Sequence, residues 1–149
     1  MPVKIAIEVA AAVVIHQGRV LLAKRQEGSL AGFWEFPGGK LEPTETFSEA
    51  AERELVEELS LSVTAHERLL IIEHEYPDKR VRLHFVHCFP VSDPDEIPVD
   101  AANDAMAGWF DPHGKILPPL CPADQTAWKQ MPWTRLLPHP ASTNAPGKD

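Results

Sequence analysis

The N-terminal part of the chain carries two apolar runs separated by a short polar segment. Val, Ile and Ala fill most of Val3–Ile15, the run Val20–Arg25 follows, and His16–Arg19 between them contains a glycine typical of a tight turn. This pattern predicts a strand, a hairpin turn and a returning strand. A further short strand is predicted over Trp34–Phe36. It runs into Pro37-Gly38-Gly39, where the two glycines permit backbone dihedrals that other residues avoid.

The clearest periodicity of the chain is helical. Apolar residues recur at every fourth position, namely Phe47, Ala51, Leu55 and Leu59. Thr46 and Glu49 have the spacing of a capping box, in which each side chain satisfies a backbone amide of the other residue. These features together predict an amphipathic helix over residues 47–59.

The second half of the chain combines strand patterns with one further helix. Strands are predicted over Leu69–Tyr76, Val81–Val91 and Ala107–Phe110, with a hairpin turn between the first two, and a helix is predicted over Ala123–Met131. Pro132 is expected to end that helix, because proline lacks a backbone donor. Strands on both sides of one strong helix favour a layered α/β domain.

Composition limits the number of domains and the kind of partner. The chain has 149 residues, 44% of them hydrophobic, which suffices for one core without a disulfide framework. Apolar content nearly ends at Leu137, so we expect a domain over residues 1–134 and a flexible tail over 135–149.

The net charge of −8 argues against binding a nucleic-acid polymer. The chain contains no run of about 20 apolar residues, so no membrane span is predicted. Cys88 and Cys121 are expected to be reduced packing residues of a cytoplasmic protein.

Three glutamates of the predicted helix share one face. Glu54, Glu57 and Glu58 fall within an arc of roughly 100°. They repel one another on an isolated helix, yet they offer the hard oxygen ligands that Mg²⁺ prefers. A run of glutamates is more often a solvated helix face, so the carboxylates alone leave both interpretations open. Arg53 and Glu45 carry the charges needed to tie the helix to the preceding loop.

The wider spacing resembles the signature of the Nudix hydrolases. In that signature Gly-x5-Glu-x7-Arg-Glu is followed by an apolar residue, any residue, Glu-Glu, any residue, Gly and an apolar residue. The positions that fit are Gly39, Glu45, Arg53, Glu54, Leu55, Glu57, Glu58 and Leu61. Ser60 stands where the family has Gly, at a helix end that is commonly left-handed, and we expect it to cost about 1 kcal/mol of local stability without removing activity. The resemblance covers about residues 5–131, where Phe33–Lys40 and Pro122–Asp124 are similar to elements of the MutT-type branch.

The resemblance implies both a fold and a reaction. The expected fold is α/β, a Nudix α/β/α sandwich with a central mixed sheet. The expected reaction is Mg²⁺-dependent hydrolysis of a (deoxy)nucleoside triphosphate to NMP and pyrophosphate, with Mn²⁺ as the alternative ion. The family pattern assigns metal binding to the Gly38 carbonyl and to Glu54, Glu57 and Glu58. It makes Glu54 the first candidate for the group that activates water, with the other two glutamates as rivals.

Other residues are candidates for substrate contacts. Gly39 and Lys40 enter the signature, and Lys40 is either a phosphate contact or an ordinary surface charge. Lys24 matches a phosphate-contacting Arg of some MutT relatives. Asp124 is the candidate for base recognition, where an ionised carboxylate would accept hydrogen bonds, and its position suits a helix cap equally well.

One carboxylate of the family pattern is displaced. Asn103, whose side-chain oxygen can ligate a metal but carries no charge, stands at the best-matching position, and Asp104 follows. Either Asp104 replaces the family carboxylate by a small register shift, or this metal position is weaker.

The leading functional hypothesis is removal of an oxidised nucleotide such as 8-oxo-dGTP from the nucleotide pool. The alternatives are hydrolysis of CTP or 5-substituted dCTP, of ADP-ribose or of a dinucleotide. An alternative of another class is a catalytically silent Nudix domain that binds a ligand. The expected partner is a small nucleotide, and the protein is expected to be a monomer or a homodimer.

Overall fold

Seven strands and three helices make up the part of the chain that the computed structural model describes, which is residues 5–91, 94, 106–115 and 117–137. In chain order the elements are β1 (Ala6–His16), β2 (Arg19–Lys24), β3 (Trp34–Glu35), β4 (Gly38–Lys40), α1 (Phe47–Leu59), β5 (Val63–Glu75), β6 (Arg80–Pro90), β7 (Ala107–Phe110), α2 (Pro122–Gln130) and α3 (Trp133–Leu136). Among these residues no helix has the length and apolar character that crossing a bilayer requires.

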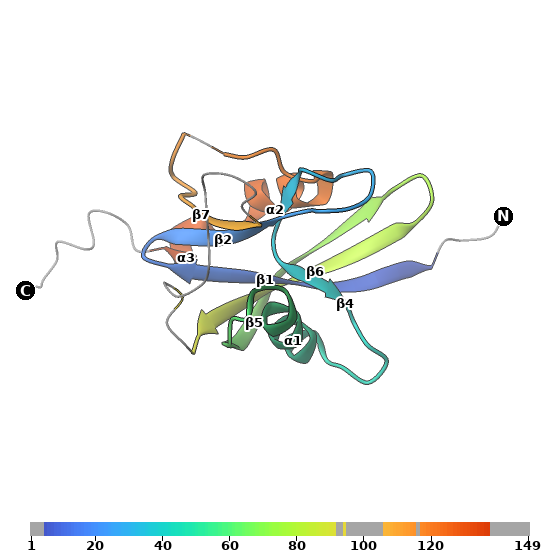
Figure 1. Ribbon diagram of the computed structural model, residues 1–149, viewed down its shortest axis with the longest axis horizontal. Coiled ribbons are helices and arrows are strands. Elements are labelled where there is room, and N and C mark those ends of the chain that lie inside the picture. The colour runs from blue at the N-terminus through green and yellow to red at the C-terminus, as the bar shows by residue number, and fades with distance from the viewer. Residues whose placement is uncertain (1–4, 92–93, 95–105, 116, 138–149) are drawn as a thin grey trace, which may run out of the picture.

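The sheet is mixed and centred on β1. This strand pairs in parallel with β6, from Ala6 opposite Arg80 to Val14 opposite Cys88, and antiparallel with β2 and β4. The main strand order is β3-β2-β1-β6-β5, with β7 attached to β2. Helix α1 covers one side of the sheet and α2 the other (Figure 1). The predicted α/β architecture, with helices on both sides of a mixed sheet, is therefore confirmed.

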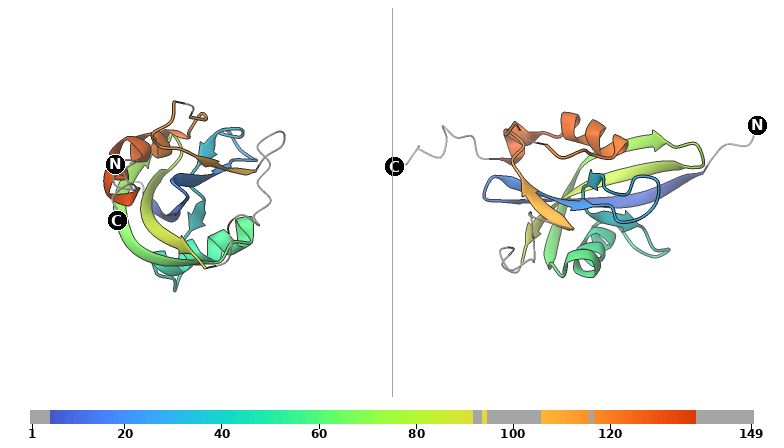
Figure 2. Two further views of the ribbon diagram at one scale, coloured as in Figure 1. Left: turned by 90° about the vertical axis from the view of Figure 1, so that its left-hand side faces the viewer. Right: turned by 45° about the horizontal axis from the view of Figure 1, so that its top comes forward.

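Two apolar layers lie on the two faces of β1, because successive strand side chains point to opposite sides. Ala10, Ala12 and Val14 pack with Leu55 of α1. Ala11 and Val13 pack with Phe36, Phe85 and the α2 residue Ala127 in the second layer. Figure 2 shows from further directions that α1 and α2 lie on opposite sides of the strands.

Helix α1 has the predicted bounds, and its two ends explain them. The Glu49 N–H donates to the Thr46 hydroxyl at 3.1 Å, and the Thr46 N–H donates to the Glu49 carboxylate at 2.9 Å, so the capping box is present. At the other end Ser60 is left-handed, with φ 54° and ψ 32°, and its N–H donates to carbonyls of the last turn. Residues next to the helix in the sequence therefore determine both of its ends.

The glycines of Pro37-Gly38-Gly39 do not use the dihedral freedom that the sequence offers. Gly38 and Gly39 begin the strand β4, and neither has a positive φ. Their role is to permit close approach: a Cβ on Gly38 would collide with the Ala10 carbonyl oxygen, and one on Gly39 with the Glu54 carboxylate.

Two further elements differ from the sequence-based expectation. Strand β5 begins at Val63, before the predicted Leu69, and reaches β6 through irregular pairing near Arg68. Pro132 follows α2 as predicted, but it is also the N-cap of α3. The expected tail from 135 onward lies mostly outside the described residues, and the domain boundary at residue 134 stays a prediction.

Candidate active site

Arg53 is the centre of the ion-pair network that positions the glutamates of α1. Its Nε donates to Glu45 at 2.5 Å, which is the predicted tie between the helix and the preceding loop. Its Nη1 lies 3.0 Å from carboxylate oxygens of both Glu54 and Glu57, and its Nη2 donates to the Lys40 carbonyl at 3.1 Å. The hydrogen bond to Glu45 raises the pKa of Arg53 and lowers that of Glu45. One guanidinium therefore holds two of the three glutamates against β4.

The third glutamate, Glu58, contacts β4 directly. Its Oε1 accepts the Gly38 N–H at 3.0 Å, while the Glu54 carboxylate lies against Gly39. Partial removal from water, with repulsion from Glu54 and Glu35, raises the pKa of Glu58 to about 7, although the Gly38 hydrogen bond opposes the shift. The carboxylates thus outnumber the cations that neutralise them, which is the arrangement a divalent ion would relieve.

An open cleft of about 710 Å³ begins at these glutamates. The titratable residues that line it are Lys24, Arg25 and Glu27 at and after the end of β2, Glu35 of β3, Glu57 and Glu58 of α1, and Lys79 of the β5–β6 turn. Acidic and basic side chains therefore share one cleft, as substrates that carry metal-bound phosphates require.

A smaller hollow of about 80 Å³ adjoins the cleft. Arg25, Glu35 and Lys79 line both spaces, which makes the two spaces neighbours. The remainder of the smaller hollow includes Cys121 and Asp124, together with apolar side chains of β1 and β6. A ligand in the cleft could therefore extend from the α1 glutamates to Asp124.

Asp124 is almost completely buried, with 3% of its surface exposed. Its Oδ1 accepts the Phe36 N–H at 3.0 Å. Burial raises the pKa of Asp124 to about 8, although this hydrogen bond opposes the shift. The raised pKa favours the neutral acid, whereas an ionised carboxylate is expected from the sequence. The helix-cap alternative is wrong, because the N-cap of α2 is Cys121 and has no side-chain cap.

The remaining predicted residues fall into three groups. Lys24 lines the cleft, with its ammonium 5.9 Å from the centroid of the Trp34 ring. Lys40 contributes its carbonyl to Arg53, but its exposed side chain does not line the cleft. Asn103 and Asp104 lie outside the described residues.

Sequence reasoning missed three residues of the two hollows: Arg25, Glu35 and Cys121. Arg25 lies 3.8 Å from the Glu35 carboxylate, and burial raises the pKa of Glu35. Burial also raises the pKa of Cys121 to about 12, which keeps the thiol protonated. One signal was present for Glu35, because strand alternation places it opposite the apolar neighbours Trp34 and Phe36.

Comparisons with known proteins agree with this geometry. A family model described as a NUDIX domain matches residues 10–130. The CTP pyrophosphohydrolase of Escherichia coli strain K12 is 38% identical over 120 residues, which cover 79% of this chain and 85% of that protein. The 8-oxo-dGTP diphosphatase of Proteus vulgaris is 41% identical over 81 residues, which cover 53% of this chain and 72% of that protein.

Solved structures give the same result. The Escherichia coli ORF135 protein is similar with a TM-score of 0.66 and 32% identity, over 87% of this chain and 91% of that chain. A MutT NUDIX hydrolase from Burkholderia pseudomallei is similar with a TM-score of 0.68 and 25% identity, over 85% of this chain and 98% of that chain.

Proposed function

Because this chain belongs to the Nudix hydrolase family, we propose that it hydrolyses a nucleoside triphosphate to a nucleoside monophosphate and pyrophosphate with the help of Mg²⁺. The observation that carries this proposal is the pair of adjoining hollows, which connect the α1 glutamates to Asp124 past Arg25 and Lys79. Carboxylates, phosphate-binding cations and a buried polar group thus lie in the order that such a substrate presents its parts.

The α1 glutamates fit a divalent cation. Glu54, Glu57 and Glu58 supply only oxygen ligands, and burial together with repulsion from Glu54 and Glu35 raises the pKa of Glu58 to about 7, a cost that a bound cation would offset. The Gly38 carbonyl is proposed as a further ligand, on the strand that the glutamates contact. A cation held by these residues would polarise the phosphoryl group and lower the pKa of the attacking water.

Proton removal from water is assigned to one of the three glutamates. Arg53 orients Glu54, the first candidate, and Glu57, its rival. Glu57 and Glu58 line the cleft in this structure, whereas Glu54 lies behind them against Gly39. Single substitutions by Gln distinguish among the three, because each removes one base and leaves the side-chain shape.

Arg25, Lys79 and Lys24 are proposed to contact the phosphates. All three line the cleft beside the glutamates, in a protein whose net charge of −8 would otherwise repel a polyphosphate. Lys40, which is not among the residues that line this cleft, is a weaker candidate for the same role.

Asp124 is proposed to recognise the base. Because Oδ1 accepts the Phe36 N–H, the protonated Oδ2 is left to donate to an acceptor on the base. O6 of an oxidised guanine meets this requirement, and so does N3 of cytosine. Unoxidised guanine carries the same O6, so this contact selects the base and not its oxidation, and 8-oxo-dGTP stays the first candidate substrate from the sequence analysis. CTP is the second candidate, and it is favoured by the similarity to a CTP pyrophosphohydrolase over most of that protein's length.

The test is pyrophosphate release from 8-oxo-dGTP, dGTP, CTP, dCTP and a 5-substituted dCTP, with Mg²⁺, with Mn²⁺ and with a chelator. Metal-dependent turnover that is fastest on 8-oxo-dGTP supports the first candidate, and turnover fastest on a cytidine nucleotide supports the second. Binding without turnover of these substrates, ADP-ribose or a dinucleotide would overturn the proposal in favour of a silent domain.

A further inference from the structure

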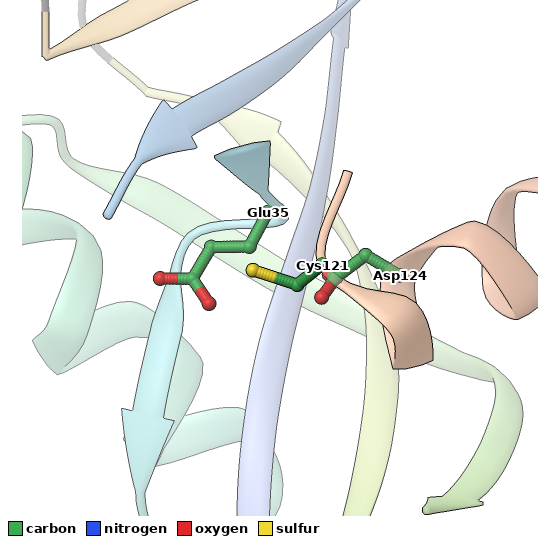
Figure 3. Close-up of side chains that lie close together, drawn as sticks. All are labelled: Glu35, Cys121 and Asp124. Carbon is green, nitrogen blue, oxygen red and sulfur yellow. The ribbon is translucent and has the colours of Figure 1, made fainter. Parts of the chain in front are cut away.

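A cysteine and two carboxylates meet in the smaller hollow. The Cys121 sulfur and one carboxylate oxygen each from Glu35 and Asp124 all lie within 4.8 Å of one another. Figure 3 shows Glu35 reaching in from β3, and Cys121 and Asp124 from the start of α2. None of these groups belongs to the α1 glutamate cluster, which contains no sulfur.

Backbone hydrogen bonds fix this meeting point. The Trp34 N–H donates to the Pro119 carbonyl at 2.8 Å, and the Cys121 N–H donates to the Trp34 carbonyl at 2.9 Å. The Phe36 N–H then donates to Asp124. The chain on both sides of Glu35 is therefore tied to the segment that carries the other two side chains. The three groups are held together before any ligand arrives, which lowers the entropy cost of binding.

The Cys121 thiol has no evident structural partner. It is 1% exposed, and in the part of the chain that the structure describes its sulfur makes no hydrogen bond to another residue. Its sulfur instead points toward Glu35 in the hollow (Figure 3). The other thiol, Cys88, is also buried, but it donates to the Val86 carbonyl at 3.5 Å. Cys121 is thus a buried, unpartnered group facing two carboxylates.

We propose that this hollow is a second metal site, which takes a thiophilic divalent cation of the Zn²⁺ class through Cys121, Glu35 and Asp124. One sulfur and two oxygens, with a water molecule in the fourth position, form the tetrahedral set that Zn²⁺ accepts and Mg²⁺ does not prefer. Binding releases the thiol proton of Cys121 and the acid proton of Asp124 to solvent, and forms one metal–sulfur and two metal–oxygen bonds. Glu35 has one oxygen 3.8 Å from Arg25 and can ligate through the other.

The site has a consequence that rests on the proposed function. Since Asp124 is the group proposed to contact the base, a cation on it excludes the base from the hollow. Zn²⁺ then raises the KM for the nucleotide in the presence of excess Mg²⁺, and a higher nucleotide concentration overcomes the inhibition.

The direct test uses Co²⁺ as a spectroscopic probe for Zn²⁺, on the full, reduced chain with saturating Mg²⁺. A near-ultraviolet charge-transfer band reports a cobalt–thiolate bond, which the oxygen-only Mg²⁺ site cannot produce. We expect one such site per chain. The band should disappear in Cys121→Ala and remain in Cys88→Ala, the matched control at the other buried thiol. Glu35→Gln should weaken Co²⁺ binding by at least about tenfold, because it removes a charged ligand.

Two results would overturn the site: no thiolate band in the wild-type protein, or a band that survives in Cys121→Ala. Circular dichroism checks that each variant folds. If Cys121→Ala does not fold, the test rests on Glu35→Gln, because Glu35 is partly exposed. In that variant unchanged Co²⁺ affinity overturns the site. The cobalt band requires no turnover. A protein that binds Co²⁺ through Cys121 but hydrolyses no nucleotide therefore refutes the proposed function and keeps the metal site.

Discussion

At the scale of single residues, the buried carboxyl of Asp124 links base recognition to stability. Its pKa of about 8 in the folded protein stands above 3.8, the ordinary value for an Asp. Between these two pH values the folded state binds more protons than the unfolded state. The free energy of unfolding therefore receives its full contribution from the protonated group below about pH 4, and loses it as pH rises toward 8.

We predict that Asp124→Asn removes this pH dependence. Asn is neutral at every pH, and its side-chain oxygen can still accept the Phe36 N–H. In urea denaturation with a chelator, the stability of Asp124→Asn relative to wild type should increase from pH 5 to pH 8, by up to about 1.4 kcal/mol per pH unit. Asp78→Asn, at an exposed residue of the β5–β6 turn, is the control. If the free energy of unfolding changes with pH in the same way for Asp124→Asn and wild type, the prediction is contradicted.

The glutamates of α1 give a second prediction at this scale. Glu54→Gln and Glu57→Gln should each lower kcat by at least about 100-fold, because the lost carboxylate serves as metal ligand or as base. Pyrophosphate release measures the rate, and circular dichroism verifies the fold. Glu73→Gln is the matched control, since Glu73 lies on β5 and pairs with Arg82. Wild-type rates in both α1 variants would refute the site assignment.

Spacing along one helix is what makes these glutamates recognisable in the sequence. Glu54, Glu57 and Glu58 are neighbours on one helix face, so their proximity needs no tertiary information. Arg25, Glu35 and Cys121 come together only through the pairing of β2 with β3 and the backbone bonds from β3 to the start of α2. The smaller hollow was therefore beyond sequence reasoning, except for Asp124.

At the scale of elements, the same distinction separates α1 from β5. Helix α1 matches its predicted bounds because Thr46 and Glu49 cap it locally and Ser60 ends it. The start of β5 depends on pairing with β6, where Val63 lies opposite Pro90 across two irregularities. Local composition does not contain that information. The same is true of β4, whose glycines are explained by contacts with β1 and α1.

The left-handed end of α1 gives a prediction at this scale. Ser60 has φ 54°, a conformation that glycine adopts without steric cost. Ser60→Gly should therefore raise the free energy of unfolding by about 0.5–1 kcal/mol, measured by urea denaturation. Ser62→Gly, at a nearby residue without a positive φ, should be neutral or destabilising. A lower stability for Ser60→Gly would show that the serine side chain contributes to the helix end.

At the scale of the whole molecule, the negative charge of the proposed catalytic site lowers the free energy of unfolding. The glutamates of α1 repel one another on one helix face, in a protein that already carries a net charge of −8. A cation that binds the folded state alone stabilises it by mass action.

We predict that Mg²⁺ at about 100 times its dissociation constant raises the free energy of unfolding by about 2.7 kcal/mol relative to a chelated sample. Denaturation in urea measures this difference, with NaCl at equal ionic strength as the control for screening. In Glu57→Gln the increase at the same Mg²⁺ concentration should be smaller. An equal increase from NaCl would mean that general screening, and not a bound ion, stabilises the protein.

The parallel pairing of β1 with β6 has a consequence for the order of events during synthesis. Ala6 meets Arg80 and Val14 meets Cys88, so β1 leaves the ribosome well before its central partner exists. At roughly 5–20 residues per second the delay is several seconds. Throughout it, the apolar stretch 10–14, which is buried in the folded protein, lacks that partner. Helix α1 is translated within this interval. Its glutamates are therefore synthesised before β6, the strand that completes the sheet next to β1.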